Sequence, residues 1–275
     1  MRIITGLQPS GKLHVGNYFG AMEPAVRMQE SGESFYFLAD YHAMSTVHDA
    51  NTLRENCSNL ATDFLAVGLD PEKCVFFRQS AVPEVNELAW ILSTVCPMGL
   101  LERCHSYKDK IAKGFSPSNA LFTYPVLMAA DILVYNADLV PVGQDQTQHL
   151  EIARTIANRF NGIYGDTFTL PAGYVPKAGA KIMSLAEPTK KMSKSDTNAN
   201  AFVLMTDDKD TIVRKFKRAV TDSDGVVRFD AENKPGVSNL MTIYSTFTGK
   251  DLAAIEAEFA GKGYGDFKLA VAEVT

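Results

Sequence analysis

The stretch "RIITGLQPSGKLHVGN", residues 2–17, combines a short β-rich run, a turn of glycine, proline and serine, and the start of a helix. "RIIT" (2–5) predicts a strand, and the helix is expected to begin near Gly16. Exposed backbone N–H groups and the helix dipole at such a point favour an anionic phosphate. The stretch is neither G-x-G-x-x-G nor a Walker P-loop, since no G-K-[ST] tail follows. An ordinary turn beside a buried His14 is the alternative interpretation.

The rest of the first half alternates apolar β-rich runs with helical patterns. Asp49 is predicted as the N-cap of the helix at 50–68, which should end at Gly68. This alternation predicts an α/β fold, a doubly wound parallel sheet with helices on both faces. The expected strands cover 2–5, 34–40, 74–79 and 138–143, and the expected helices cover 50–68, 84–95, 118–136 and 145–160.

Unusual polar clusters follow the expected strands. They are "TGLQPSGKLHVGN" (5–17), "DYHAMS" (40–45) and "VGQDQ" (142–146). Ligands of open parallel sheets bind beyond the carboxyl ends of the strands, so these clusters indicate a binding site. The alternative is that strand ends are simply where loops must be polar.

The pattern changes at about residue 166, where a long region rich in proline and glycine has no helical period. Long loops of this kind are often functional. Helices are expected at 208–222, 237–249 and 251–261, and a last helix stops in mid-pattern. We therefore expect an α/β domain with a helical insertion at 1–185, and a loop followed by a smaller α-helical domain at 186–275. The chain is expected to be shorter than a complete relative.

Composition narrows the possible classes of protein. The chain has 275 residues and a formal net charge of -5, so any nucleic-acid site must be a local basic patch. No signal peptide and no stretch of transmembrane length is visible, which favours a cytoplasmic protein with no membrane contact. No two cysteines are spaced as C-x-x-C, which disfavours a zinc site and favours reduced packing thiols. The cysteines are Cys57, Cys74, Cys96 and Cys104.

A second distinctive stretch is "PTKKMSKSD" (188–196). A lysine–serine run taken alone is usually a solvated loop. Here "KMSKS" (191–195) matches the second signature of class I aminoacyl-tRNA synthetases, and "HVGN" (14–17) resembles their HIGH signature. The two stand in the order and at about the separation that the family has, and the first follows the first strand.

Further stretches resemble the bacterial tryptophanyl branch of that family, from the first residues to about 268. Asn17 stands where the general motif has its second histidine, as in that branch, and Thr197 stands where relatives often have proline. The resembling stretches are "GLQPSGKLHVGNYFGA" (6–21), "FTYPVLMAADIL" (122–133), "PVGQDQTQHLE" (141–151), "PTKKMSKSD" (188–196) and "KPGVSNLMTIYS" (234–245).

The resemblance implies a Rossmann-like class I synthetase fold and a reaction in two steps. The carboxylate of L-tryptophan attacks the α-phosphorus of ATP, giving tryptophanyl-adenylate and pyrophosphate, and tRNA(Trp) then accepts the amino acid. ATP would carry Mg²⁺, no protein-bound metal is expected, and the family is homodimeric. A tyrosyl-type class I synthetase and a non-enzymatic paralogue that binds tryptophan or RNA are the alternatives. The basic clusters at 177–194 and 209–218 could contact RNA phosphates, although a solvated helix face is the plain alternative for the second.

Such a reaction needs positioning and cations rather than a strong base, because the carboxylate is already a nucleophile. The resemblance implies that Lys191 and Lys194 stabilise the pyrophosphate, that Lys110 reaches the phosphates and that Asn17 holds them. For Lys110 a solvated helix end is the rival interpretation. The implied ATP-binding residues are Gln8, Pro9, Ser10, His14, Gly16, Asn17, Gly143, Gln144, Asp145, Ile182, Lys191, Met192, Ser193, Lys194 and Ser195.

Asp131 lies in the apolar run "VLMAADILVY" (126–135), where a lone carboxylate is costly unless it is paired. A carboxylate only accepts hydrogen bonds and an indole N–H only donates them, so Asp131 would suit tryptophan. A helix-surface aspartate is the alternative, and His42 could equally be a satisfied buried histidine. The implied tryptophan-binding residues are Asp131, Tyr124, Met128, Ile132, His42 and Gln146.

Overall fold

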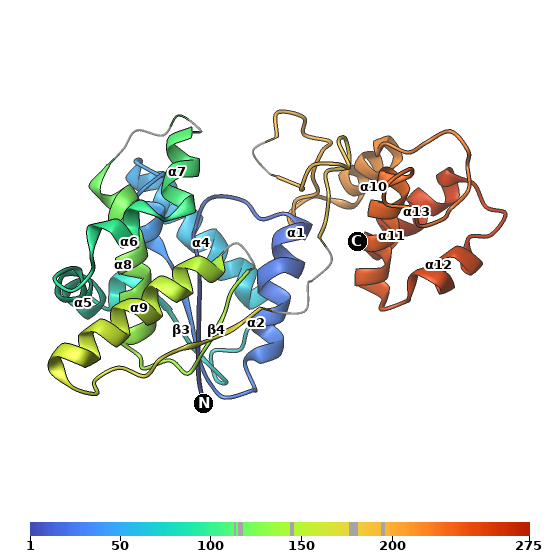
Figure 1. The fold of residues 1–275 in the computed structure, drawn as a ribbon. Helices are drawn as coiled ribbons and strands as arrows, with labels where there is room; N and C mark the ends of the chain where they lie inside the picture. Colours follow the sequence, from blue (N-terminus) through green and yellow to red (C-terminus); the bar gives the residue numbers. More distant parts are fainter. Residues whose placement is uncertain (113, 115–117, 144–145, 176–180, 194–195) are drawn as a thin grey trace. The chain divides into compact units, whose positions relative to one another are not determined.

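The structure is a computed structural model that describes residues 1–112, 114, 118–143, 146–175, 181–193 and 196–275 (Figure 1). The chain forms two compact units. The first contains Met1–Gly11 and Pro24–Pro176, and the second contains Lys12–Glu23 and Lys177–Thr275. The short segment that carries "HVGN" therefore belongs to the same unit as the C-terminal part of the chain. The domain boundary expected after residue 185 stays a prediction.

The first unit is built on a five-stranded sheet in the order β3-β2-β1-β4-β5, with every neighbouring pair parallel. The first strand is central and the chain winds outward from it in both directions, so the prediction of a doubly wound α/β sheet is confirmed. The strands are β1 (Arg2–Leu7), β2 (Glu33–Leu38), β3 (Val75–Arg78), β4 (Leu139–Pro141) and β5 (Ala172–Tyr174).

Strand β5 was not predicted. It lies in the region after residue 166 that was expected to be loop, and that expectation is wrong for these three residues. Ala172, Gly173 and Tyr174 are all exposed. An exposed strand needs no apolar run, so the sequence carries no strand signal there. Pairing with β4 creates this strand, because Leu139, Val140 and Pro141 lie opposite its three residues.

The helices of the first unit pack around the sheet (Figure 1). The Asp49 carboxylate accepts a 2.7 Å hydrogen bond from the Thr52 N–H, which confirms the expected N-cap of α4. Gly68 follows that helix with φ of 100°, as expected for its end. The elements are α2 (Glu23–Met28), α3 (Asp40–Ala43), α4 (Ala50–Ala66), the 3₁₀ turn η2 (Gln79–Ala81), α5 (Glu84–Ser93), α6 (Met98–Glu102), α7 (His105–Ala112), α8 (Asn119–Leu133) and α9 (Thr147–Tyr164).

The second unit is helical and has its own apolar core. Val15 and Phe19, from the short N-terminal segment, belong to this core together with Ile182 and Met192. Both signature stretches therefore contribute side chains to one core. The elements are α1 (Val15–Asn17), the π-helical turn η1 (Tyr18–Met22), α10 (Lys209–Arg218), α11 (Pro235–Thr248), α12 (Leu252–Glu258) and α13 (Tyr264–Val274). None of the helices that the structure describes is both long and apolar enough to span a membrane.

Candidate active site

Asp131 lies on α8 in the first unit and is 2% exposed, so it is not a surface aspartate. Its Oδ2 lies 2.9 Å from Nε2 of His42, and its Oδ1 accepts a 2.7 Å hydrogen bond from Nε2 of Gln79. Burial raises the pKa of Asp131, and the contacts with His42 and Gln79 act in the opposite direction. The lone carboxylate of the apolar helix is thus paired, as the cost of burial requires.

Gln79 was not predicted as a site residue. It is 0% exposed, and its Oε1 accepts a 3.1 Å hydrogen bond from the Tyr41 N–H while its Nε2 binds Asp131. The side-chain amide therefore connects the start of α3 to α8. One signal could have found it, because Gln79 directly follows strand β3 at the carboxyl edge of the sheet.

Tyr124 also lies on α8, and its hydroxyl oxygen is 2.5 Å from Nε2 of His149. His149 is 2% exposed, and Sγ of Cys104 lies 3.4 Å from the same nitrogen. The rings of Tyr124 and His42 meet edge to face with centroids 6.2 Å apart. The sequence did not indicate His149, because it lies in the first turn of an amphipathic helix, where a buried polar residue has no local signature.

Met128 and Ile132 face the same core as the rest of α8. Ile132 is 3% exposed, and Met128 packs, partly buried, against that core. Their predicted contacts with tryptophan stay predictions. Gln146 lies at the N-terminus of α9, and its N–H donates a 2.9 Å hydrogen bond to the Gly143 carbonyl.

The segment "HVGN" forms a compact turn in the second unit. The backbone N–H of His14 donates a 3.0 Å hydrogen bond to Oδ1 of Asn17, and the Asn17 N–H donates one of 2.7 Å back to the His14 carbonyl. A Cβ added at Gly16 would lie 3.0 Å from two atoms of the His14 ring. Glycine is therefore the residue that lets this turn close over the imidazole.

Residues 203–205 hold the same turn from outside. The Val15 N–H donates to the Val203 carbonyl at 3.0 Å, and the Met205 N–H donates to the Leu13 carbonyl at 3.0 Å. A buried ion pair supports this segment, since Asp207 accepts from the Leu204 N–H at 2.8 Å and from Nζ of Lys215 at 2.5 Å. Lys215 is 4% exposed and so serves the fold rather than the basic surface of α10.

The second signature forms a short antiparallel hairpin. Met183 pairs with Lys191, the Ser184 N–H donates to the Lys190 carbonyl at 2.9 Å, and the Met192 N–H donates to the Ile182 carbonyl at 3.1 Å. The Ile182 and Met192 side chains are both 3% exposed, whereas Lys191 is exposed. The hairpin therefore anchors itself by two apolar side chains and leaves the first lysine of the signature at the surface.

The remaining predicted site residues lie as follows. In the first unit Nε2 of Gln8 donates to the His42 carbonyl and to Oγ1 of Thr46, each at 3.3 Å, and the Ser10 N–H donates to the Gln8 carbonyl at 2.8 Å. Pro9 is buried, Gly143 is exposed and, in the second unit, Ser193 is exposed. Lys110 falls within α7, and its side chain lies outside the described part of the structure, as do Gln144, Asp145, Lys194 and Ser195.

The predicted absence of a metal cage stays a prediction. Among the described residues, no three His, Cys, Asp or Glu side chains are grouped so that they could hold a metal ion.

Comparison with known proteins gives consistent relatives. Residues 1–275 match the family model described as class I tRNA synthetases (W and Y). The tryptophan–tRNA ligase of Oceanobacillus iheyensis is 53% identical over 270 residues, which covers 98% of this chain and 83% of that protein. The ligase of the same name from Bacillus subtilis is 50% identical over 272 residues, covering 99% of this chain and 82% of that protein.

Solved structures agree with these relatives. The tryptophanyl-tRNA synthetase of Campylobacter jejuni, complexed with ADP and tryptophan, superposes with a TM-score of 0.86 at 45% identity, covering 100% of this chain and 84% of that one. A tyrosyl-tRNA synthetase from Aeropyrum pernix superposes with a TM-score of 0.75 at 20% identity over 100% of this chain and 82% of its own, a likeness of fold alone.

Proposed function

The chain belongs to the class I tRNA synthetases for tryptophan and tyrosine, and on that premise we propose that it is a tryptophan–tRNA ligase, which activates L-tryptophan with ATP and transfers it to tRNA(Trp). The observation that carries the choice of amino acid is the buried Asp131 carboxylate, held between Gln79 and His42. A carboxylate oxygen can accept more than one hydrogen bond, so Asp131 retains the capacity to accept an indole N–H.

This arrangement supports tryptophan over other apolar amino acids. A site whose buried polar group needs a donor rejects an analogue without one, typically by roughly 10⁴–10⁵ in other synthetases. The phenylalanine side chain has no N–H, so it would not donate the hydrogen bond that the indole gives to the Asp131 carboxylate. We assign Tyr124, Met128, Ile132, His42 and Gln146 to the same amino acid, with Gln79 and His149 as the residues that hold Asp131 and Tyr124.

The chemistry proposed for the first step is displacement at phosphorus. The tryptophan carboxylate attacks the α-phosphorus of ATP, the bond to the bridging oxygen breaks, and pyrophosphate leaves with the electron pair. Charge grows on the leaving group, so ammonium groups placed beside it lower the barrier. Lys191 and Lys194 are assigned this role, with Lys110 as a further cation. Mg²⁺ would arrive on ATP and neutralise part of the phosphate charge.

The nucleotide is assigned to the two signatures and to the loop after β4. His14, Gly16 and Asn17 would lie against the phosphates, and Gly143, Gln144 and Asp145 would contact the ribose. Ile182 and Met192 are buried in the core, which supports a role as apolar anchors of the hairpin beside any contact with adenine. Gln8, Pro9, Ser10, Ser193 and Ser195 complete the proposed ATP-binding set.

The partners proposed for the chain are tRNA(Trp) and a second copy of itself. Lys209, Lys217 and Arg218 are exposed on α10 and could contact RNA phosphates without reading sequence. Trp90 and Met98, on α5 and α6, are 76% and 63% exposed, and such apolar exposure supports an interface between copies.

The test is ATP–pyrophosphate exchange measured separately with each amino acid. We expect exchange with tryptophan, and charging of tRNA(Trp) when the RNA is added. Exchange with tyrosine but not tryptophan would favour the tyrosyl-type alternative. Binding of tryptophan with neither exchange nor charging would favour the non-enzymatic alternative.

A further inference from the structure

The hairpin of the second signature leaves two backbone groups directed away from its own partner strand. Its two hydrogen bonds, from Ser184 to Lys190 and from Met192 to Ile182, flank the pair formed by Met183 and Lys191. In an antiparallel ladder, a residue between two such bonds turns its N–H and C=O outward. Met183 therefore presents one donor and one acceptor on the side opposite Lys191.

Asn239 of α11 pairs with both of these groups. Its Oδ1 accepts a 2.8 Å hydrogen bond from the Met183 N–H, and its Nδ2 donates one of 2.9 Å to the Met183 carbonyl. The side chain is 4% exposed. A primary amide offers a donor and an acceptor side by side, so Asn239 acts as one residue of a third strand. A carboxylate at this position would set an oxygen against the Met183 carbonyl.

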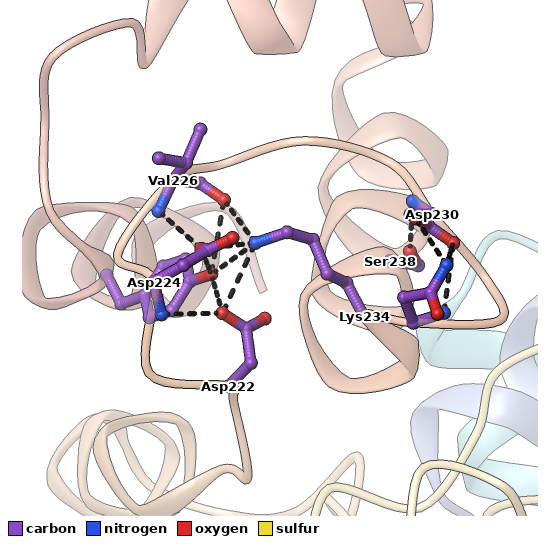
Figure 2. Close-up of polar contacts among 8 residues, drawn as sticks. Asp222, Asp224, Val226, Asp230, Lys234 and Ser238 are labelled. Carbon is purple, nitrogen blue, oxygen red and sulfur yellow. Dashed lines mark hydrogen bonds and ion pairs between the residues drawn. The ribbon is translucent and has the colours of Figure 1, made fainter.

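The helix that carries Asn239 is itself fixed at its first turn. Lys234 precedes α11, and its ammonium group bonds the carboxylates of Asp222 and Asp224, the Val226 carbonyl at 3.2 Å and the Tyr264 hydroxyl at 3.0 Å. Figure 2 shows the Lys234 side chain extending toward Asp222 and Asp224. It also shows the bond between Ser238 and the N–H of Asp230, which is 2.9 Å long.

The contacts of Lys234 fix the start of α11, and α11 in turn fixes the hairpin through Asn239. Ile182 and Met192 anchor the hairpin in the core by their side chains. Asn239 fixes the position of its backbone at Met183. Lys191 lies directly opposite Met183, so its Cα moves with that backbone. Loss of the amide would leave the part-buried N–H and C=O of Met183 without the side chain that pairs with them. We expect the hairpin backbone to shift in response.

We propose that Asn239 is a positioning residue for adenylate formation, which holds the signature hairpin so that Lys191 is set for the phosphates. The inference rests on the proposed function, because it concerns the rate of that reaction. Asn239 acts through the backbone of Met183 and is not itself assigned a contact with substrate.

The kinetic test compares Asn239→Ala and Asn239→Asp with the wild type in tryptophan-dependent ATP–pyrophosphate exchange. We expect kcat to fall about tenfold or more in both variants, because alanine loses both hydrogen bonds to Met183, whereas aspartate loses the bond to the Met183 carbonyl and sets an oxygen against it. Tryptophan Kd should stay within about twofold, because the residues assigned to tryptophan belong to the other compact unit. The control is Thr242→Val on the same helix, whose hydroxyl donates a 2.8 Å hydrogen bond to the Ser238 carbonyl, and its kcat should stay within about twofold.

Hydrogen exchange of the Met183 amide supplies a readout that needs no activity. The amide should be protected in the intact wild type and should exchange about tenfold faster in Asn239→Ala. A wild-type Met183 amide as labile as an exposed one would overturn the inference, even if the variants do not fold. Folded variants with wild-type kcat would also overturn it. A wild type without tryptophan-dependent exchange would instead refute the proposed function, while the amide measurement would still test the contact.

Discussion

Gln79 donates a 2.7 Å hydrogen bond from Nε2 to Oδ1 of Asp131, and both side chains are buried. His42 lies 2.9 Å from the other carboxylate oxygen. The orientation of Asp131 is therefore set before any ligand arrives. Such preorganisation matters because a side chain that must turn on binding gives back part of the energy of the new bond.

The first prediction concerns the amino acid. Asp131→Asn should raise the tryptophan KM by about 10- to 100-fold, because a hydrogen bond to a charged group is worth roughly 1.5–3 kcal/mol. The ATP KM should change little. Exchange assays at varied tryptophan and varied ATP measure both. Asp63→Asn is the matched control, since Asp63 is a half-buried carboxylate on α4 of the same unit. An unchanged tryptophan KM in Asp131→Asn would remove Asp131 from the proposed site.

The second prediction concerns stability of the second unit. Lys234→Met should lower the free energy of unfolding by about 2 kcal/mol, because it leaves the partly buried Asp222 without its cation. We expect less than the loss of a fully buried pair, since half of the Asp224 side chain is exposed. Urea unfolding measures the change. Lys250→Met, which breaks a surface pair with Glu258, should have little effect, and an equal loss in the two variants would contradict the prediction.

The third prediction is the pH dependence of the difference in free energy of unfolding between the wild type and Lys234→Met. Burial alone would lower the pKa of Lys234, but hydrogen bonds with Asp224, Tyr264 and Asp222 raise it. The bond from Lys234 lowers the pKa of Asp224, as does the Val226 N–H. The contribution of Asp224 is thus present above its unfolded pKa of about 4 and is lost as pH falls through the lower folded pKa. The contribution of Lys234 to the free energy of unfolding is fully present below its unfolded pKa of about 10.4. It is lost only as pH rises through the higher folded pKa.

The stability difference between the wild type and Lys234→Met should accordingly hold from about pH 5 to about pH 9 and shrink toward about pH 3. Urea titrations at these values provide the measurement. A difference that stays the same at about pH 3 and about pH 7 would show that the Asp224 carboxylate does not take part.

The sequence predicted elements and site residues correctly where a local pattern depends on the burial of the residues themselves. Apolar runs predicted four of the five strands of the described sheet, and a single acid in an apolar helix indicated Asp131. The partners of that acid were not visible, because Gln79 lies 52 residues from Asp131 and Tyr124 lies 25 residues from His149. Packing brings these side chains together, and no short motif encodes it. Strand β5 was missed for a related reason, since only its pairing with β4 defines it.

The two units also combine segments in a way that periodicity does not predict. Residues 12–23 come soon after β1 in the sequence, yet they belong to the C-terminal unit. Their attachment depends on Val15 and Phe19 in that core and on backbone bonds to Val203 and Met205. The sequence shows the order of the two signatures, but only the structure shows that their side chains share one core.

The fourth prediction separates two neighbouring lysines. Lys191→Ala should lower kcat of exchange by about 100-fold or more, in the range seen when one electrostatic stabiliser is removed from an active site. Lys190→Ala should stay within about twofold, because Nζ of Lys190 forms a surface pair with Glu187 at 2.5 Å. Both variants should unfold at the wild-type urea concentration. Equal losses of kcat would mean that general surface charge, and not Lys191, supports the reaction.

The fifth prediction uses two glycines of the N-terminal segment. A Cβ at Gly16 would lie 3.0 Å from Cε1 and Nδ1 of His14 and 3.7 Å from Cβ of Ile182. A Cβ at Gly20 would meet none of its described neighbours within 4 Å. Gly16→Ala must therefore displace the His14 ring by a few tenths of an ångström, and we expect the ATP KM to rise about fivefold or more. Gly20→Ala should leave the KM unchanged and raise the free energy of unfolding by about 0.5 kcal/mol, because alanine loses less backbone entropy in a helical turn. Exchange kinetics and urea unfolding of the two variants give these values. If Gly16→Ala kept the wild-type KM for ATP, the tight turn around His14 would have to be assigned to folding, and the nucleotide would have to be held without it.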